Sequence, residues 1–93
     1  MVSVAENRSD LVVLPMGEPE PGPAEGWLTW RVLVEEARPV DGWAHLLAAL
    51  VGREVTALLP PSLASLPVDG PWQVHAELVR PGTIRVHDRP NRT

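Results

Sequence analysis

The sequence predicts a mostly β protein, a single small five-stranded barrel with one short helical turn. Two observations lead to this prediction. Short stretches of the chain alternate between apolar and polar side chains, which is the period of a half-buried strand. Turns rich in Gly, Pro and Asp separate these stretches at intervals of about ten residues. Closing the sheet into a barrel removes its exposed strand edges.

The first 26 residues differ in composition from the rest of the 93-residue chain. They hold the whole net charge of −4, and their prolines at positions 15, 19, 21 and 23 fix the backbone and lack an N–H donor. We therefore predict an acidic, Pro-rich leader over residues 1–26, which contains a short β-competent run at Leu11–Leu14. The barrel domain is predicted over residues 27–88, and a flexible polar tail over residues 89–93.

The first stretch of the predicted domain, Trp27–Glu36, has the pattern of a strand. One face collects the apolar residues Leu28, Trp30, Val32 and Val34. Pro39 and the Asp41-Gly42 pair then end the strand, because both favour a turn.

The next run, Trp43–Val51, has two interpretations. Its Ala and Leu residues place apolar side chains at helical spacing, with Asp41 as the N-cap and Gly52 after the last turn. Gly52-Arg53 also has the length of a two-residue hairpin loop between two strands. Both interpretations stay open: a strand of the barrel, or an α+β fold with a helix over residues 42–51.

The remaining strands are predicted at Glu54–Leu59, Trp72–Val79 and Thr83–His87, because apolar residues alternate along each of them. Pro60-Pro61 ends the first of these strands, and Ser62–Leu66 is predicted to form the single helical turn. Together with Trp27–Glu36 and the strand interpretation of residues 43–51, these make the five strands of the barrel.

The apolar residues of the final hairpin predict how its two strands pair. Its two strands bury their apolar residues on one face only if Leu78 lies opposite Ile84. The same register places two polar pairs on the outer face: Glu77 with Arg85, and His75 with His87. It requires a three-residue loop, Arg80–Gly82, in which Gly82 takes a positive φ.

Part of the chain resembles a known family. The resemblance rests on the Gly-led strand Gly52–Pro60, the turn up to Leu66, and the apolar positions Val74, Ala76, Leu78, Ile84 and Val86. In this pattern, residues 28–88 resemble the small OB-type barrels of TOBE and MOP domains, found at the ends of transporter ATPases and in oxyanion-binding proteins. The resemblance implies an OB-type barrel that binds a small oxyanion, with Ser62 as the matching polar residue. MOP domains have a Ser-Ala-Arg-Asn segment and a strand lysine where this chain has Trp27–Trp30 and Val79.

Residue types that carry chemistry are scarce. The chain has no Cys, which excludes disulfides, thiolate metal sites and a Cys nucleophile. Its basic residues are all Arg, and over residues 27–93 they are balanced by an equal number of acids, which disfavours nucleic acid as a partner. The Ser and His residues lack the spacing of a hydrolase or metal motif. We therefore expect no enzyme activity, no cofactor and no metal site.

The predicted location is the cytoplasm. Residues 1–10 contain charges and no apolar run of the kind that a secretory signal needs. The longest apolar stretch, Leu46–Val51, is far below the roughly 18 residues that span a bilayer, so we expect no membrane insertion.

The predicted function is binding. We expect a non-catalytic accessory or protein-interaction module whose partner is another protein or a second copy of the chain. A small-ligand or oxyanion-binding domain of the TOBE type is the first alternative, and an OB-type nucleic-acid binder is the second. The residues predicted to form the partner or ligand surface are Trp27, Ser62, His75, Glu77, Arg85 and His87. Trp27 is included because it falls on the polar face of its strand, where an aromatic ring can anchor a partner.

Overall fold

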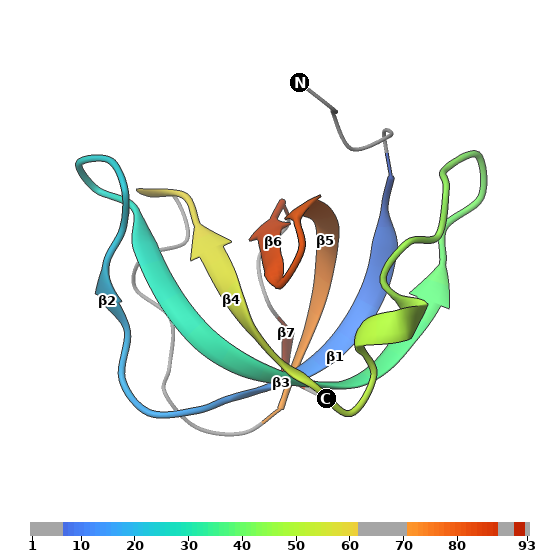
Figure 1. Cartoon of the computed structure of the whole chain (residues 1–93), viewed down its shortest axis with the longest axis horizontal. Coiled ribbons are helices and arrows are strands. Elements are labelled where there is room, and N and C mark those ends of the chain that lie inside the picture. Colours follow the sequence, from blue (N-terminus) through green and yellow to red (C-terminus); the bar gives the residue numbers. More distant parts are fainter. Residues whose placement is uncertain (1–6, 62–70, 88–90, 93) are drawn as a thin grey trace.

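The computed structural model describes residues 7–61, 71–87 and 91–92, and it shows a mostly β fold without an α-helix in this part of the chain (Figure 1). The five strands that form a closed barrel are β1 (Ser9–Pro15), β3 (Leu28–Pro39), β4 (Glu54–Leu59), β5 (Trp72–Arg80) and β6 (Thr83–Val86). Two-residue strands, β2 (Glu20–Pro21) and β7 (Asn91–Arg92), extend the sheet beside β3 and β5. A 3₁₀ turn, η1 (Ala48–Leu50), lies between β3 and β4.

The strands follow the order β1-β3-β4-β6-β5, and pairing of β1 with β5 closes the ring. All neighbours are antiparallel except β4 and β6, which are parallel. The barrel is therefore mixed, because the chain crosses from β4 to β5 before it returns as β6 between them. The predicted fold class, a small mostly β barrel of five strands, is confirmed.

The identity of one barrel strand differs from the prediction. Residues 43–51 form neither a strand nor an α-helix, and β1, from the predicted leader, takes the place in the barrel. The boundary at residue 27 is thus wrong for Ser9–Pro15, whose Leu11 and Val13 are each 1% exposed in the core. Pro21 also pairs with Leu28, so prolines in the leader do not keep it out of the sheet. A proline is tolerated at such a strand position when no ladder hydrogen bond from its nitrogen is needed.

The core confirms the predicted faces of the strands. Alternate residues point inward, and the buried apolar set is Leu11, Val13, Trp30, Val32, Val34, Leu47, Val55, Ala57, Leu59, Trp72, Val74, Ala76, Ile84 and Val86. Trp30 and Trp72 meet edge to face in the barrel, with ring centroids 4.8 Å apart. The Nε1 of Trp30 donates a 3.1 Å hydrogen bond to the carbonyl oxygen of Gly17, which ties the loop after β1 to the core.

The segment between β3 and β4 covers one end of the barrel. Its Leu47 side chain is fully buried in the core. His45 Nδ1 lies 2.7 Å from the hydroxyl of the buried Ser9, and the Arg8 amide donates a 3.1 Å hydrogen bond to the Ala44 carbonyl. Gly42 flanks the segment with a positive φ of 84°, a conformation that side chains disfavour. The segment is therefore a fixed cap on the barrel end.

The register of the final hairpin is confirmed. Leu78 lies opposite Ile84, Glu77 opposite Arg85, and the amide of His87 donates a 2.8 Å hydrogen bond to the carbonyl of His75. The loop is shorter than predicted, because Arg80 pairs with Thr83 and leaves two residues, with a β-bulge at Val79 that restores the register.

Gly82 does take a positive φ, at 76°. The side-chain amide of Asn7 closes the bulged end by exchanging hydrogen bonds of 3.1 and 2.7 Å with the carbonyl and amide of Leu78.

Two further predictions concern the ends of elements. The helical turn at Ser62–Leu66 lies outside the described residues. In the predicted flexible tail, Asn91 and Arg92 pair with β5, so this part of the tail belongs to the sheet. Within the described residues, the structure contains no helix with the length and apolar character that a membrane span requires.

Candidate binding surfaces

The predicted polar residues of the final hairpin form a cluster on the outer face of the barrel. Glu77 accepts hydrogen bonds from the Nε of Arg85 at 2.8 Å and from the second guanidinium nitrogen, Nη2, and its Oε1 lies 2.7 Å from His87 Nε2. His75 Nδ1 lies 3.5 Å from the Asp10 carboxylate on β1. The cluster spans β1, β5 and β6 because these strands are adjacent in the ring.

Glu77 is the electrostatic centre of this cluster. Burial raises the pKa of its carboxyl group, but hydrogen bonds from Arg85 and His87 and their positive charge lower it by more, so the net pKa lies below the ordinary value of 4.5. The carboxylate therefore stays ionised and holds the Arg85 guanidinium. An arginine that is neutralised in this way has little remaining attraction for a free oxyanion.

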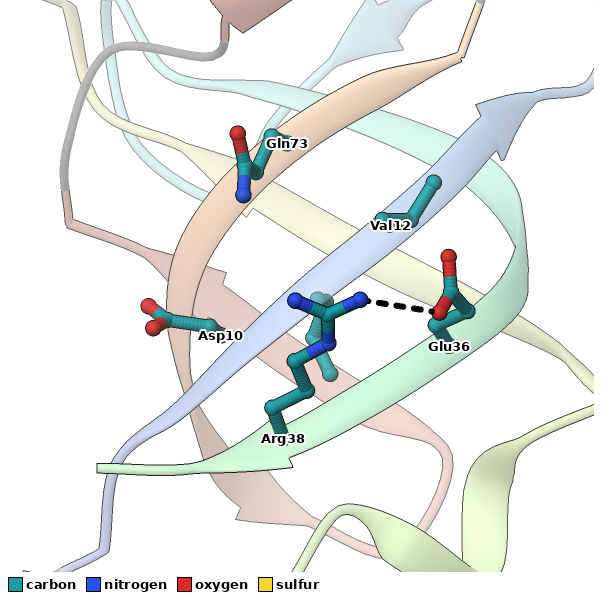
Figure 2. Close-up of a pocket in the computed structure, with 6 residues that line it drawn as sticks. Asp10, Val12, Glu36, Arg38 and Gln73 are labelled. Carbon is teal, nitrogen blue, oxygen red and sulfur yellow. Dashed lines mark hydrogen bonds and ion pairs between the residues drawn. The ribbon is translucent and has the colours of Figure 1, made fainter. Parts of the chain in front are cut away.

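A shallow pocket of about 300 Å³ lies beside the cluster, on the outer face of β3, β1 and β5 (Figure 2). Its lining residues are Asp10, Leu11, Val12, Glu36, Arg38 and Gln73. Arg38 reaches across β1 and pairs with Glu36 at 3.3 Å, but both side chains are more than half exposed. An ion pair so open to water contributes little to fixing the two side chains.

A second pocket, of about 320 Å³, lies over β3 and β4 next to the loop that follows β1. The residues that line it are Met16, Gly17, Glu18, Glu20, Thr29, Trp30, Arg31 and Thr56. Two carboxylates face one arginine here, so the pocket repels a phosphate chain.

One serine and one histidine are in hydrogen-bond contact, which is the geometry of a nucleophile and its base. The pair is Ser9 and His45, at 2.7 Å. The Ser9 side chain is fully buried inside the end of the barrel, so its oxygen cannot reach a substrate. The contact anchors the segment between β3 and β4 and has no geometry for acyl transfer.

Large apolar side chains are exposed on the segment that covers the barrel end. Trp43, Leu46 and Val51 are 42%, 36% and 46% exposed, and we call these three residues the apolar end. Arg8 extends across the ring of Trp43, with its guanidinium carbon 5.0 Å from the ring centroid. This contact and the buried Leu47 hold the apolar end in place.

The structure brings together four of the six predicted surface residues. His75, Glu77, Arg85 and His87 share one face, whereas Ser62 lies outside the described residues. Trp27 precedes β3, which is separated from β5 and β6 by a strand on either side. It is half-buried beside Gly22, where an added Cβ would lie 2.8 Å from the Trp27 Cβ.

The sequence prediction missed Asp10 and the apolar end. Asp10 had a detectable signal, because Ser9, Leu11 and Val13 alternate with it as in a strand. Trp43 is the exposed tryptophan that was expected at position 27, and no local pattern distinguished it from a core residue. Among the described residues, no group of three or more His, Cys, Asp or Glu side chains could hold a metal ion.

No family model, curated protein or solved structure matches this chain.

Proposed function

We propose that this protein is a non-catalytic interaction module that binds another polypeptide chain through its apolar end. The observation that carries the proposal is the exposure of Trp43, Leu46 and Val51 on a segment fixed to a closed barrel. A flexible loop could fold such side chains away from water, but Leu47 and His45 hold this segment in place. Exposed apolar groups on a rigid support are typical of protein interfaces.

The composition of the apolar end supports the same proposal. Trp and Arg are the residue types that contribute most often to interface hot spots, and here Arg8 already lies over Trp43. Their mutual contact orders both side chains before binding, so less rotamer entropy is lost when a partner docks. The polar cluster around Glu77, in contrast, satisfies its charges internally.

The two alternative functions receive less support. An OB-type barrel binds oligonucleotides on the face of its second and third strands, which here are β3 and β4 with the acidic second pocket. Oxyanion binding loses its best candidate cation, because Arg85 is paired with Glu77.

Site-specific photocrosslinking in the native cells tests the proposal. A photoreactive amino acid at position 46 should yield adducts of defined mass with a polypeptide, because Leu46 lies at the apolar end. The matched control is position 16, since Met16 is 38% exposed but lies beside Arg31 in another region. Absence of adducts at 46, or equal adducts from both positions, would contradict the proposal.

A further inference from the structure

We infer that the apolar end binds the same surface on a second copy of this chain, so that the protein forms a two-fold symmetric dimer. The inference rests on the proposed function and names its partner. Three features of the molecule lead to it: the position of the acidic loop, the charges of both signs close to the apolar end, and the self-complementary character of that surface.

Three acidic residues without a basic neighbour in their loop lie away from the apolar end. The loop between β1 and β3, residues 16–27, contains Glu18, Glu20 and Glu25 and no cation. This loop joins the start of the twelve-residue strand β3, whereas the apolar end follows the finish of the same strand. Figure 1 shows β2 and η1 on opposite sides of the barrel. Two copies with a net charge of −4 each therefore repel least when they approach through their apolar ends.

Charges of both signs lie close to the apolar end. Arg8 lies across the Trp43 ring, and in the sequence Asp41 precedes Trp43 while Arg53 and Glu54 follow Gly52. A second copy therefore meets an apolar centre flanked by both acidic and basic residues, which offer partners to the same residues of the first copy.

The surface also contains both members of a charge pair. Neither Arg8 nor Asp41 forms an ion pair within the described part of the chain. In a two-fold interface, each contact occurs twice with the roles of the copies exchanged. Arg8 of each copy thus meets Asp41 of the other copy. Trp43, Leu46 and Val51 of one copy pack against the same three residues of the other.

Sedimentation equilibrium of the purified full chain gives the first test. We expect a mass of twice 10.2 kDa at high protein concentration, with reversible dissociation on dilution. A mass of 10.2 kDa at every accessible concentration would overturn the inference.

A pair of substitutions locates the interface. Leu46→Arg should raise the dissociation constant about tenfold or more, because it places a charge at the interface centre. Met16→Arg is the matched control, since Met16 is 38% exposed against 36% for Leu46. The control should change the constant less than about twofold. Thermal unfolding followed by circular dichroism checks that both variants fold, and Val51→Lys repeats the test at another exposed position. Equal effects of Leu46→Arg and Met16→Arg would overturn the inference.

A mixing experiment tests the reciprocal charge pairing. Arg8→Asp alone and Asp41→Arg alone should each weaken their own homodimer, because like charges then face each other twice. Mixed together, the two variants should associate more tightly than either alone, since both pairings are restored in the heterodimer. Mixtures that associate no better than the separate variants would overturn the two-fold arrangement.

The crosslinking result separates this inference from the proposed function. Adducts from position 46 with the mass of two chains support both. Adducts of another mass, together with a monomer in sedimentation, would overturn the dimer and leave the interaction module in place. Absence of adducts from that position would contradict the module itself.

Discussion

Strand β1 and the segment 43–51 are both short apolar runs, yet one becomes a barrel strand and the other covers the barrel end. β1 lies between β3 and β5 and buries Leu11 and Val13 completely. Segment 43–51 buries Leu47 but leaves Trp43, Leu46 and Val51 exposed. The comparison shows that an apolar run becomes a barrel strand when it can pair with the free edges of two other strands, as β1 does with β3 and β5. Its own pattern of apolar residues matters less.

The composition of the two runs fits their different places. Leu11–Leu14 contains two β-branched valines, which pack well on a pleated surface. Segment 43–51 contains three alanines and one valine, and it is bordered by Gly42 and Gly52 at positive φ. These glycines turn the chain across the barrel end, and the alanines offer little side chain for a strand to bury.

The largest effect is expected from a substitution that disrupts β1. Leu11→Asp should prevent cooperative folding, because an unpaired carboxylate would enter the core of a small domain at a position that is 1% exposed. Circular dichroism during heating measures the effect. The adjacent Val12→Asp is the control, since Val12 points outward and should tolerate the change. A cooperative Leu11→Asp variant would show that β1 is not needed to close the barrel.

The next largest effect is a difference in stability between substitutions at buried and at exposed residues of segment 43–51. Leu47→Ala should lower the free energy of unfolding by about 2 to 5 kcal/mol, because it leaves a cavity at a fully buried position. Leu46→Ala should change the stability of the monomer by less than about 0.5 kcal/mol. Urea unfolding at a protein concentration low enough to keep the chain monomeric gives both values. Similar losses for the two variants would mean that the segment packs differently from the structure.

A smaller effect concerns the contact that joins β1 to segment 43–51. Ser9→Ala should cost about 0.5 to 1.5 kcal/mol, the range for one hydrogen bond, because it removes the 2.7 Å contact with His45. Hydrogen exchange should show faster exchange of the Arg8 amide, which is bonded to Ala44. If exchange of this amide stays unchanged, the Ser9 contact does not hold the segment in place.

The smallest expected effect is the loss of stability in acid that Glu77 causes in the barrel wall. The folded pKa of Glu77 is lowered, so its contribution to stability is present above the ordinary value of 4.5 and is lost as the pH falls from there through the folded value. Urea unfolding should therefore show a steeper loss of stability in acid for the native chain than for Glu77→Gln. Glu36→Gln is the control, because the Glu36 side chain is 56% exposed in its pair with Arg38. Equal acid slopes for all three proteins would contradict the role of Glu77.

Much of the fold was predictable because strand alternation is a local property. Trp30, Val74 and Ile84 are buried where the period of two placed them, and Glu77 meets Arg85 because the hairpin must bury its apolar residues on one face. The loop length was wrong by one residue, since the bulge at Val79 offers a second way to keep the same register.

The candidate surface was predictable only where it lies within one hairpin. His75 and His87 come from the same hairpin, so their proximity followed from the register. Asp10 reaches His75 only because β1 closes onto β5, across a long separation in the sequence. The exposure of Trp43 likewise depends on how segment 43–51 packs on the barrel end, and the spacing of apolar residues in the sequence does not predict that packing.

The sequence by itself determined the mostly β class, the inward faces of β3, β4, β5 and β6, and the pairing of β5 with β6, because adjacent side chains on a strand point to opposite faces whatever their neighbours are. Only the tertiary structure decided which run fills the place between β3 and β5 and which run covers the barrel end. Closure requires pairing between segments far apart in the chain, and the energy of that pairing depends on edges that exist only once the other strands have assembled.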